Sequence, residues 1–266
     1  MTAAGTRRVL EDPADVEFTA HALADGAVVG HPFGNVYALS ARPTPESVRR
    51  LNRLLGDAPD RLGCLVTTRP RVPTVFDWAR LPRRLSRPLV TSLVDRLLGL
   101  GPCGFRGPAA PHLPGCLATW DGEVRTTLLI APGYACPSNV LLGRAMQLLG
   151  TDYLCTTPTA PATSADGLRP LVAGAPDVLL LTHLNDASAA AAYPLHAPGS
   201  PTVVAFHRLG QADLDGRPRL LIERAGSLDQ AALDREMQSF GWRLVWPAPT
   251  HPYGDGATEA RYAGGP

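Results

Sequence analysis

Lysine is absent from this chain: all 25 of its basic residues are arginines. A lysine Schiff base, the lysine of a phosphate-binding P-loop and a lysine general base are therefore excluded. Aromatic residues are also scarce, at 6% of 266 residues, and charged residues make up only 18%. The 24 acidic side chains nearly balance the basic ones, which excludes a strongly basic nucleic-acid tail and an acidic disordered chain.

Long apolar runs and paired cysteines are missing as well. No run approaches the roughly 18 apolar residues of a membrane-spanning helix, and the first residues show no apolar signal segment. The five cysteines form no CxxC pair, and the seven histidines show no metal-ligand spacing. We therefore expect a cytoplasmic protein with reduced thiols, no membrane partner and no metal.

Strand-like and helix-like segments alternate along the chain. The segment 44–56 has a clear helical signal, because Thr44 can cap it, Pro45 suits its first position and Gly56 can end it. Interleaved elements of this kind predict the α/β class. Further helices are expected at 89–100, 138–149, 164–173 and 228–240, and strands at 26–31, 36–41, 63–68, 116–120, 124–131, 152–157, 177–183, 201–207 and 219–224.

The chain shows no internal repeat and no linker long enough to divide it. We expect a loose leader at residues 1–16, one domain at 17–246 and a disordered tail at 247–266. Within the domain, residues 69–115 are rich in proline and arginine and read as an insertion.

Arginine is unevenly distributed. Residues 61–100 hold eight arginines against two acids, Asp77 and Asp95. One interpretation is a surface for an anionic partner such as RNA, bound through Arg83 and Arg84. The alternative is a solvated segment whose arginines pair with acids elsewhere in the fold. The sequence leaves both open.

Several motifs occur in the order typical of one family. They are GAVVGHPFGNVYALSA (26–41), GCLV (63–66), LLIAPGY (128–134), CTTPTAPA (155–162), PTVVA (201–205) and LIERAGSL (221–228). This series resembles the YrdC-like family, whose best-known members are threonylcarbamoyl-adenylate synthases. The resemblance runs over about residues 20–238. It implies a single YrdC-like domain, in which a twisted mixed sheet with flanking helices surrounds a large concave cavity.

The departures from the family pattern concern the residues that hold ATP. Leu55, Asp57 and Ile130 stand where the resemblance places cations, whereas Arg224, Tyr37 and Thr202 keep the family residues. Phosphoryl chemistry depends on cationic donors around the phosphates. Other arginines could substitute for the missing cations, but we expect none of them near the replaced positions. ATP should therefore bind weakly, and no cofactor is firmly implied.

Two classes of function follow. The first is a diverged, transferase-like enzyme that acts on a small, less anionic ligand in the family cavity, for example by acyl or carbamoyl transfer in a specialised biosynthetic pathway. The second is a non-catalytic binding protein for RNA or a metabolite; residual ATP-dependent threonylcarbamoyl-adenylate synthesis is a further alternative. The expected catalytic residues are His31, Cys155 and Arg224, and the expected ligand-binding residues are Asn35, Tyr37, Thr157, Thr159 and Thr202.

Overall fold

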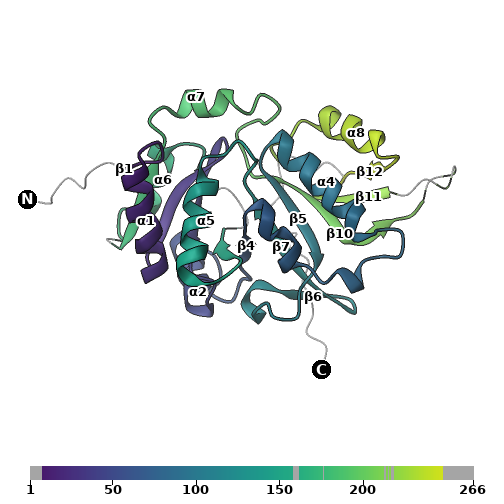
Figure 1. Cartoon of the computed structure of the whole chain (residues 1–266), viewed down its shortest axis with the longest axis horizontal. Coiled ribbons are helices and arrows are strands. Elements are labelled where there is room, and N and C mark those ends of the chain that lie inside the picture. Colours follow the sequence, from purple (N-terminus) through teal and green to yellow (C-terminus); the bar gives the residue numbers. More distant parts are fainter. Residues whose placement is uncertain are drawn as a thin grey trace, which may run out of the picture.

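The computed structural model describes residues 8–157, 162–175, 177–212, 214, 216 and 219–247. Its strands are β1 (Arg8–Val9), β2 (Val28–Phe33), β3 (Val36–Ala41), β4 (Cys64–Val66), β5 (Cys103–Pro108), β6 (Thr119–Asp121), β7 (Val124–Ala131), β8 (Leu154–Thr156), β9 (Val178–Thr182), β10 (Thr202–Gly210), β11 (Arg219–Arg224) and β12 (Arg243–Val245). They form one mixed sheet in the order β1-β9-β2-β3-β8-β4-β7-β5-β10-β11-β12, with β6 paired to β7 (Figure 1).

Helices cover both faces of this sheet. They are α1 (Pro13–Asp25), α2 (Pro45–Leu55), α3 (Val72–Val75), α4 (Arg87–Leu100), α5 (Ser138–Leu149), α6 (Ala165–Val172), α7 (Asp186–Ala191) and α8 (Gln230–Ser239). Short 3-10 turns lie at Arg69–Arg71, Trp78–Arg80 and Gly115–Leu117. Figure 1 shows α1 beside α5, and α4 beside α8.

Two apolar clusters separate the helices from the sheet. One contains Val16 of α1 and Leu141 of α5 together with Val66 and Ile130 of the sheet. The other, larger cluster joins the opposite face to α2, α4, α6 and α8. The α/β class and the twisted mixed sheet expected from the sequence are confirmed.

The ends of α2 are formed as the sequence predicts. The Thr44 hydroxyl accepts a hydrogen bond from the Ser47 N–H, Pro45 opens the helix, and Gly56 ends it at φ +71°. The hairpin of β6 and β7 is also confirmed, with Asp121 opposite Val124.

The prediction of a loose leader is wrong for residues 8–16. β1 pairs with β9, and Asp12 caps α1 by accepting from the Ala14 N–H, with Pro13 at the first helical position. Residues 1–7 and 248–266 lie outside the described residues.

The reading of residues 69–115 as an insertion is wrong too. This segment contains α4, which is buried along one side, and β5, which lies in the sheet between β7 and β10. The high proline and arginine content of this segment led to the wrong prediction for β5, a strand of the core.

Candidate functional site

The charges of three arginines far apart in the sequence act on one thiol, that of Cys64 at the start of β4. Burial raises the pKa of Cys64 to about 12, while the charges of Arg224, Arg106 and Arg61 each act to lower it. Burial lowers the pKa of Arg224, and the charges of Arg106 and Arg61 act in the same direction. The three guanidinium groups therefore lie close enough to influence one another. We call Arg61, Arg106 and Arg224 the arginine cluster.

Carboxylates of the chain already accompany two of these cations. Arg61 Nη1 lies 2.6 Å from Asp57 Oδ2, and Arg106 Nε donates to Glu223 Oε2 at 2.6 Å. Arg224 Nε donates to the Pro201 carbonyl at 3.0 Å. The expectation that no arginine lies near the replaced positions is wrong, because Arg61 follows Asp57 by four residues and pairs with it.

Glu223 is held by a wider network. Its Oε1 lies 3.6 Å from Arg208 Nη2 and 3.8 Å from His207 Nε2. His207 Nε2 in turn lies 2.6 Å from Asp121 Oδ2. These contacts link β10, β11 and β6, and they hold the Glu223 carboxylate beside Arg106.

His31 lies in β2 and is fully buried, next to Ser40 of β3 and Ser138 of α5. Its Nδ1 donates to the Pro32 carbonyl at 2.8 Å, and its Nε2 lies 2.9 Å from the Ser40 hydroxyl. Burial lowers the pKa of His31 to about 4, so the ring is neutral. An inaccessible histidine with both nitrogens engaged fits a structural role better than the catalytic role expected from the sequence.

Cys155 lies in β8 with none of its surface exposed. Its thiol donates to the Arg42 carbonyl at 3.0 Å, and burial raises its pKa. Since the thiolate is the reactive form of cysteine, these surroundings do not suit the expected nucleophile.

Tyr37 and Thr202 hold parts of the fold together. The Tyr37 hydroxyl donates to Asp186 Oδ1 at 2.7 Å and accepts from the His183 N–H at 3.2 Å. The Thr202 hydroxyl accepts from the N–H groups of Gly226 and Leu228. Both side chains therefore fix neighbouring turns.

Asn35 and Thr157 each bury an oxygen that has no hydrogen-bond partner in the described structure, Oδ1 and Oγ1 respectively. Asn35 Nδ2 donates to the carbonyls of His196 and Ala197. Thr157 follows β8, and its N–H donates to the Leu39 carbonyl of β3. Thr159 lies outside the described residues.

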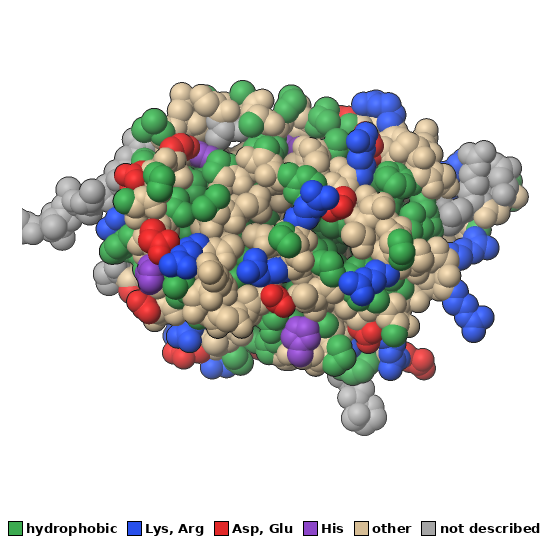
Figure 2. All heavy atoms as spheres, viewed as in Figure 1, with side chains coloured by type: hydrophobic (Ala, Val, Ile, Leu, Met, Phe, Trp, Pro, Cys, Tyr) green, Lys and Arg blue, Asp and Glu red, His purple; other side chains and the backbone are tan. Residues whose placement is uncertain are grey.

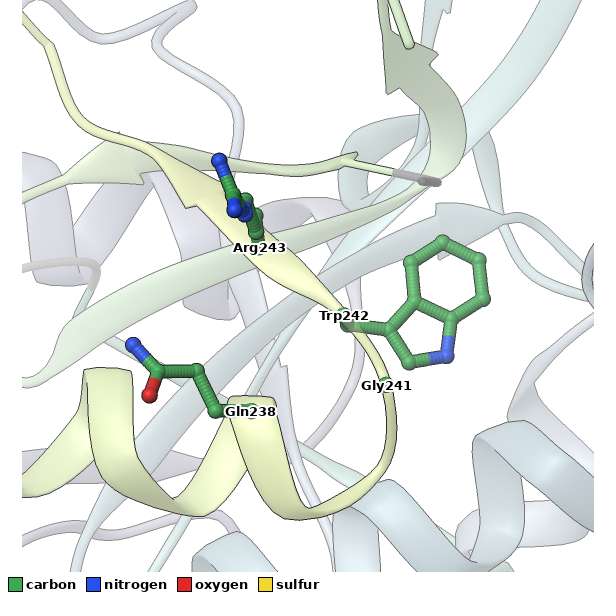
Figure 3. A pocket seen from close by; sticks show the side chains of 4 residues that line it. All are labelled: Gln238, Gly241, Trp242 and Arg243. Atoms are coloured by element: carbon green, nitrogen blue, oxygen red, sulfur yellow. The ribbon is translucent and has the colours of Figure 1, made fainter. Parts of the chain in front are cut away.

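Two cavities open elsewhere on the surface. One, of about 550 Å³, lies at the end of α8 and the start of β12 and is lined by Gln238, Gly241, Trp242 and Arg243 (Figure 3). The other, of about 380 Å³, lies beside the end of β9 and is lined by Glu11, Ala135, Pro137, His183, Leu184, Asn185, Ser188, Ala192 and Tyr193. The expected catalytic residues are not among the residues that line either cavity.

Sequence reasoning missed Arg61, Arg106 and Glu11. Arg61 could have been found from its spacing to Asp57, whereas nothing in the sequence marks Arg106 or Glu11. No group of three or more His, Cys, Asp or Glu side chains in the described part of the chain is placed to hold a metal ion. None of the described helices is both long and apolar enough to cross a bilayer.

No protein-family model and no curated protein sequence matches this chain. Solved structures do match. Sua5 of P. abyssi, complexed with L-threonine, is 14% identical with a TM-score of 0.61, and the match covers 88% of this chain and 60% of that protein. The hypothetical protein smu.1377c of Streptococcus mutans UA159 is 12% identical with a TM-score of 0.60 and coverage of 84% and 92%.

A third match extends this set. E. coli YciO is 12% identical, with a TM-score of 0.54 and coverage of 80% of this chain and 90% of that one. The match thus spans less than two thirds of the length of Sua5, but about nine tenths of the length of the two other proteins. Identities this low establish the fold alone, and the resemblance seen in the sequence is confirmed at that level: the chain has the strongly diverged fold of the Sua5/YrdC proteins.

Proposed function

We propose that this protein binds a small ligand carrying a single carboxylate, of the amino-acid class, at the arginine cluster. The observation that carries the proposal is the geometry at Glu223, which accepts from Arg106 of β5 at 2.6 Å and directly precedes Arg224 on β11. The charges of Arg61, Arg106 and Arg224 also all act on the Cys64 thiol. Guanidinium groups suit carboxylates because their planar donors match the two oxygens. The P. abyssi Sua5 structure with L-threonine supports this ligand class.

The charge of the cluster favours such a ligand over ATP. Asp57 and Glu223 offset Arg61 and Arg106, so the described cluster offers much less positive charge than its three arginines suggest. A triphosphate brings several negative charges close to these two carboxylates. Each charge-assisted hydrogen bond contributes roughly 1.5–3 kcal/mol, and a compensated arginine supplies only part of that.

Acyl or carbamoyl transfer to the bound ligand would depend on orientation and on charge stabilisation by the cluster. His31 and Cys155 do not suit covalent catalysis, because the one is neutral and enclosed and the other is a buried thiol. Transfer on this scaffold needs no protein nucleophile when the ligand itself provides the attacking group.

Calorimetry with L-threonine as the probe tests the proposal. We expect L-threonine to bind and Arg224→Lys to weaken it at least about tenfold, because lysine keeps the charge but loses the planar fork. The melting temperature should change little. Arg235→Lys, at an exposed position of α8, makes the same substitution away from the cluster and should have no effect.

A second measurement separates this proposal from ATP-dependent synthesis. With ATP, magnesium, bicarbonate and threonine present, we expect no pyrophosphate release. Tight ATP binding in the low micromolar range together with pyrophosphate release would refute the proposal, as would L-threonine binding that Arg224→Lys leaves unchanged.

RNA binding is a second candidate, favoured by one observation. Of the eight arginines in 61–100, four pair with carboxylates: Arg61 with Asp57, Arg69 with Asp95, Arg71 with Asp152 and Arg96 with Glu236. The other four, Arg80, Arg83, Arg84 and Arg87, are exposed and form no ion pair with any described carboxylate.

Among the residues that the structure describes, the face drawn in Figure 2 carries no large basic patch. Figure 2 shows arginine and acidic side chains interspersed there. We expect at most weak, salt-dependent binding of a single-stranded RNA. It should weaken further when Arg83 and Arg84 are changed to glutamine, which gel-shift titration at two salt concentrations can measure.

A further inference from the structure

The cavity beside the end of β9 has a chemistry different from that of the arginine cluster. We call it the Glu11 cleft. Among its described lining residues, Glu11 is the only acidic one, and none is an arginine. Its volume of about 380 Å³ falls within the range of small-molecule sites. Ala135, Pro137 and Leu184 supply apolar walls.

Glu11 is held in place by two hydrogen bonds. Its Oε1 lies 2.9 Å from His183 Nδ1, and its Oε2 accepts from the Leu184 N–H at 2.9 Å. Partial burial raises the pKa of Glu11, but these two bonds, together with a bond to its own backbone and the charge of His183, outweigh that effect and lower it. The carboxylate is therefore ionised at neutral pH. The Glu11 side chain is 42% exposed, so it can still reach a ligand, whereas the His183 side chain is only 7% exposed.

The wall that carries His183 is also fixed. Tyr37 accepts from the His183 N–H and donates to Asp186. Asn185 Oδ1 accepts from the N–H groups of Ala187 and Ser188 at the start of α7. A site on such a wall needs little reorganisation when a ligand enters, which favours binding.

The lining determines which charge the cleft can accept. It contains a fixed carboxylate and no arginine among its described residues. An anion would be repelled by Glu11, whereas an ammonium group would gain a charge-assisted hydrogen bond. Leu184 is 67% exposed, so it adds an apolar surface to this cleft that a ligand can contact.

We propose that the Glu11 cleft binds a small organic amine, with the ammonium group on the Glu11 carboxylate and the apolar body against Ala135, Pro137 and Leu184. This site is separate from the arginine cluster and takes a ligand of opposite charge. Its walls come from the start of α1, the start of α5 and the segment around α7, whereas the cluster lies on β5, β11 and the loop before β4.

Three probes with one apolar body test the charge preference: 2-phenylethylamine, 2-phenylethanol and phenylacetate. Calorimetric or NMR titration should show the amine binding best, the alcohol less well and the carboxylate at least about tenfold more weakly than the amine. Phenylacetate binding as tightly as the amine would overturn the proposal.

Two variants locate the binding. Glu11→Gln keeps a hydrogen-bond acceptor and should weaken amine binding at least about tenfold with little effect on the alcohol. Ala135→Phe, at an exposed wall position, should fill the cleft and weaken both. Glu123→Gln, at the exposed turn before β7, removes the same charge elsewhere and serves as the control.

The outcomes are decisive even if one variant fails to fold. If amine binding survives in the folded Glu11→Gln or Ala135→Phe protein at wild-type strength, the proposal is wrong. Arg224→Lys should leave amine binding unchanged, so failure of the proposed carboxylate site and failure of this one are distinguishable.

Discussion

The arginine cluster and the Glu11 cleft hold their charged side chains in different ways. In the cluster, Arg106 is set on a strand in the middle of the sheet, and carboxylates beside Arg61 and Arg106 reduce the net charge. In the cleft, Glu11 comes from a short segment between β1 and α1, and a histidine ring and a backbone N–H fix it.

This difference shows how one sheet can carry sites of opposite preference. Strand residues in neighbouring positions are held rigidly, so several cations can be kept close together despite their repulsion. Residues at the ends of elements are free to vary without disturbing the core, and binding groups often lie there. The fold therefore fixes where ligands can bind, and the side chains at each place decide their charge.

The largest expected effect is that of a substitution at Gly226, which lies close to the arginine cluster and not in the Glu11 cleft. A Cβ at this position would lie 2.4 Å from the Ser200 carbonyl oxygen and 2.4 Å from the Thr202 nitrogen, both backbone atoms. Gly226→Ala should therefore destabilise the protein by about 3 kcal/mol or more, because the turn beside Arg224 must move. Chemical denaturation measures this change.

The same variant should damage the two sites unequally. In the folded fraction, L-threonine binding should be lost while 2-phenylethylamine still binds in the Glu11 cleft. Gly99→Ala, in α4 with no atom within 4 Å of the new Cβ, is the matched control and should cost nothing. Equal loss of both ligands would show that the two regions are not independent.

Much of the fold could be predicted because its signals are local. The apolar strands, the caps of α2 and the β6–β7 hairpin follow from residues next to one another in the sequence. β5 could not be recognised in this way, because it reads CGFRGP and has no apolar run. Gly104 belongs in a core strand for a non-local reason: a Cβ there would lie 2.9 Å from Ile130 and 2.9 Å from Val203.

The candidate site was harder to predict, because its neighbours are set by sheet order. Cys64, Arg106 and Arg224 come from three different strands, and their relative positions depend on the order β4, β7, β5, β10 and β11 across the sheet. His31 shows the opposite difficulty: the sequence predicts it as the last residue of a strand, and it does lie in β2, but the sequence could not show that its ring faces Ser40 in the core.

The second prediction concerns the loss of folding stability at low pH, to which the buried His31 should contribute. Its pKa of about 4 in the folded protein lies below the ordinary value of 6.5, so the unfolded chain binds the proton more readily. Stability is therefore lost as the pH falls from 6.5 to about 4, by about 3 kcal/mol for this group. His196, whose pKa burial also lowers to about 4, adds to the same loss.

Denaturation at several pH values tests this assignment. His31→Gln should show a smaller loss of stability across the window, whereas His21→Gln, at an exposed position of α1, should behave like the wild type. Because the Pro32 carbonyl beside His31 also accepts from Ser138, acid should loosen the start of α5 and with it the Pro137 wall of the Glu11 cleft. An unchanged pH profile in His31→Gln would contradict the prediction.

The smallest effect concerns Glu223, whose carboxylate reduces the positive charge of the arginine cluster. Glu223→Gln leaves Arg106 without its 2.6 Å partner charge and so raises the positive potential around Cys64. Inorganic pyrophosphate should then bind about tenfold more tightly than to the wild type, by about 1.4 kcal/mol, and the gain should shrink at high salt. Glu236→Gln removes an equally close partner from Arg96, also at 2.6 Å, but on α8 and away from the cluster, so it should not change pyrophosphate binding. If Glu223→Gln gains no affinity, the carboxylates do not limit the anionic charge that the cluster accepts, and the contrast with the Glu11 cleft must come from the shape of the two sites instead.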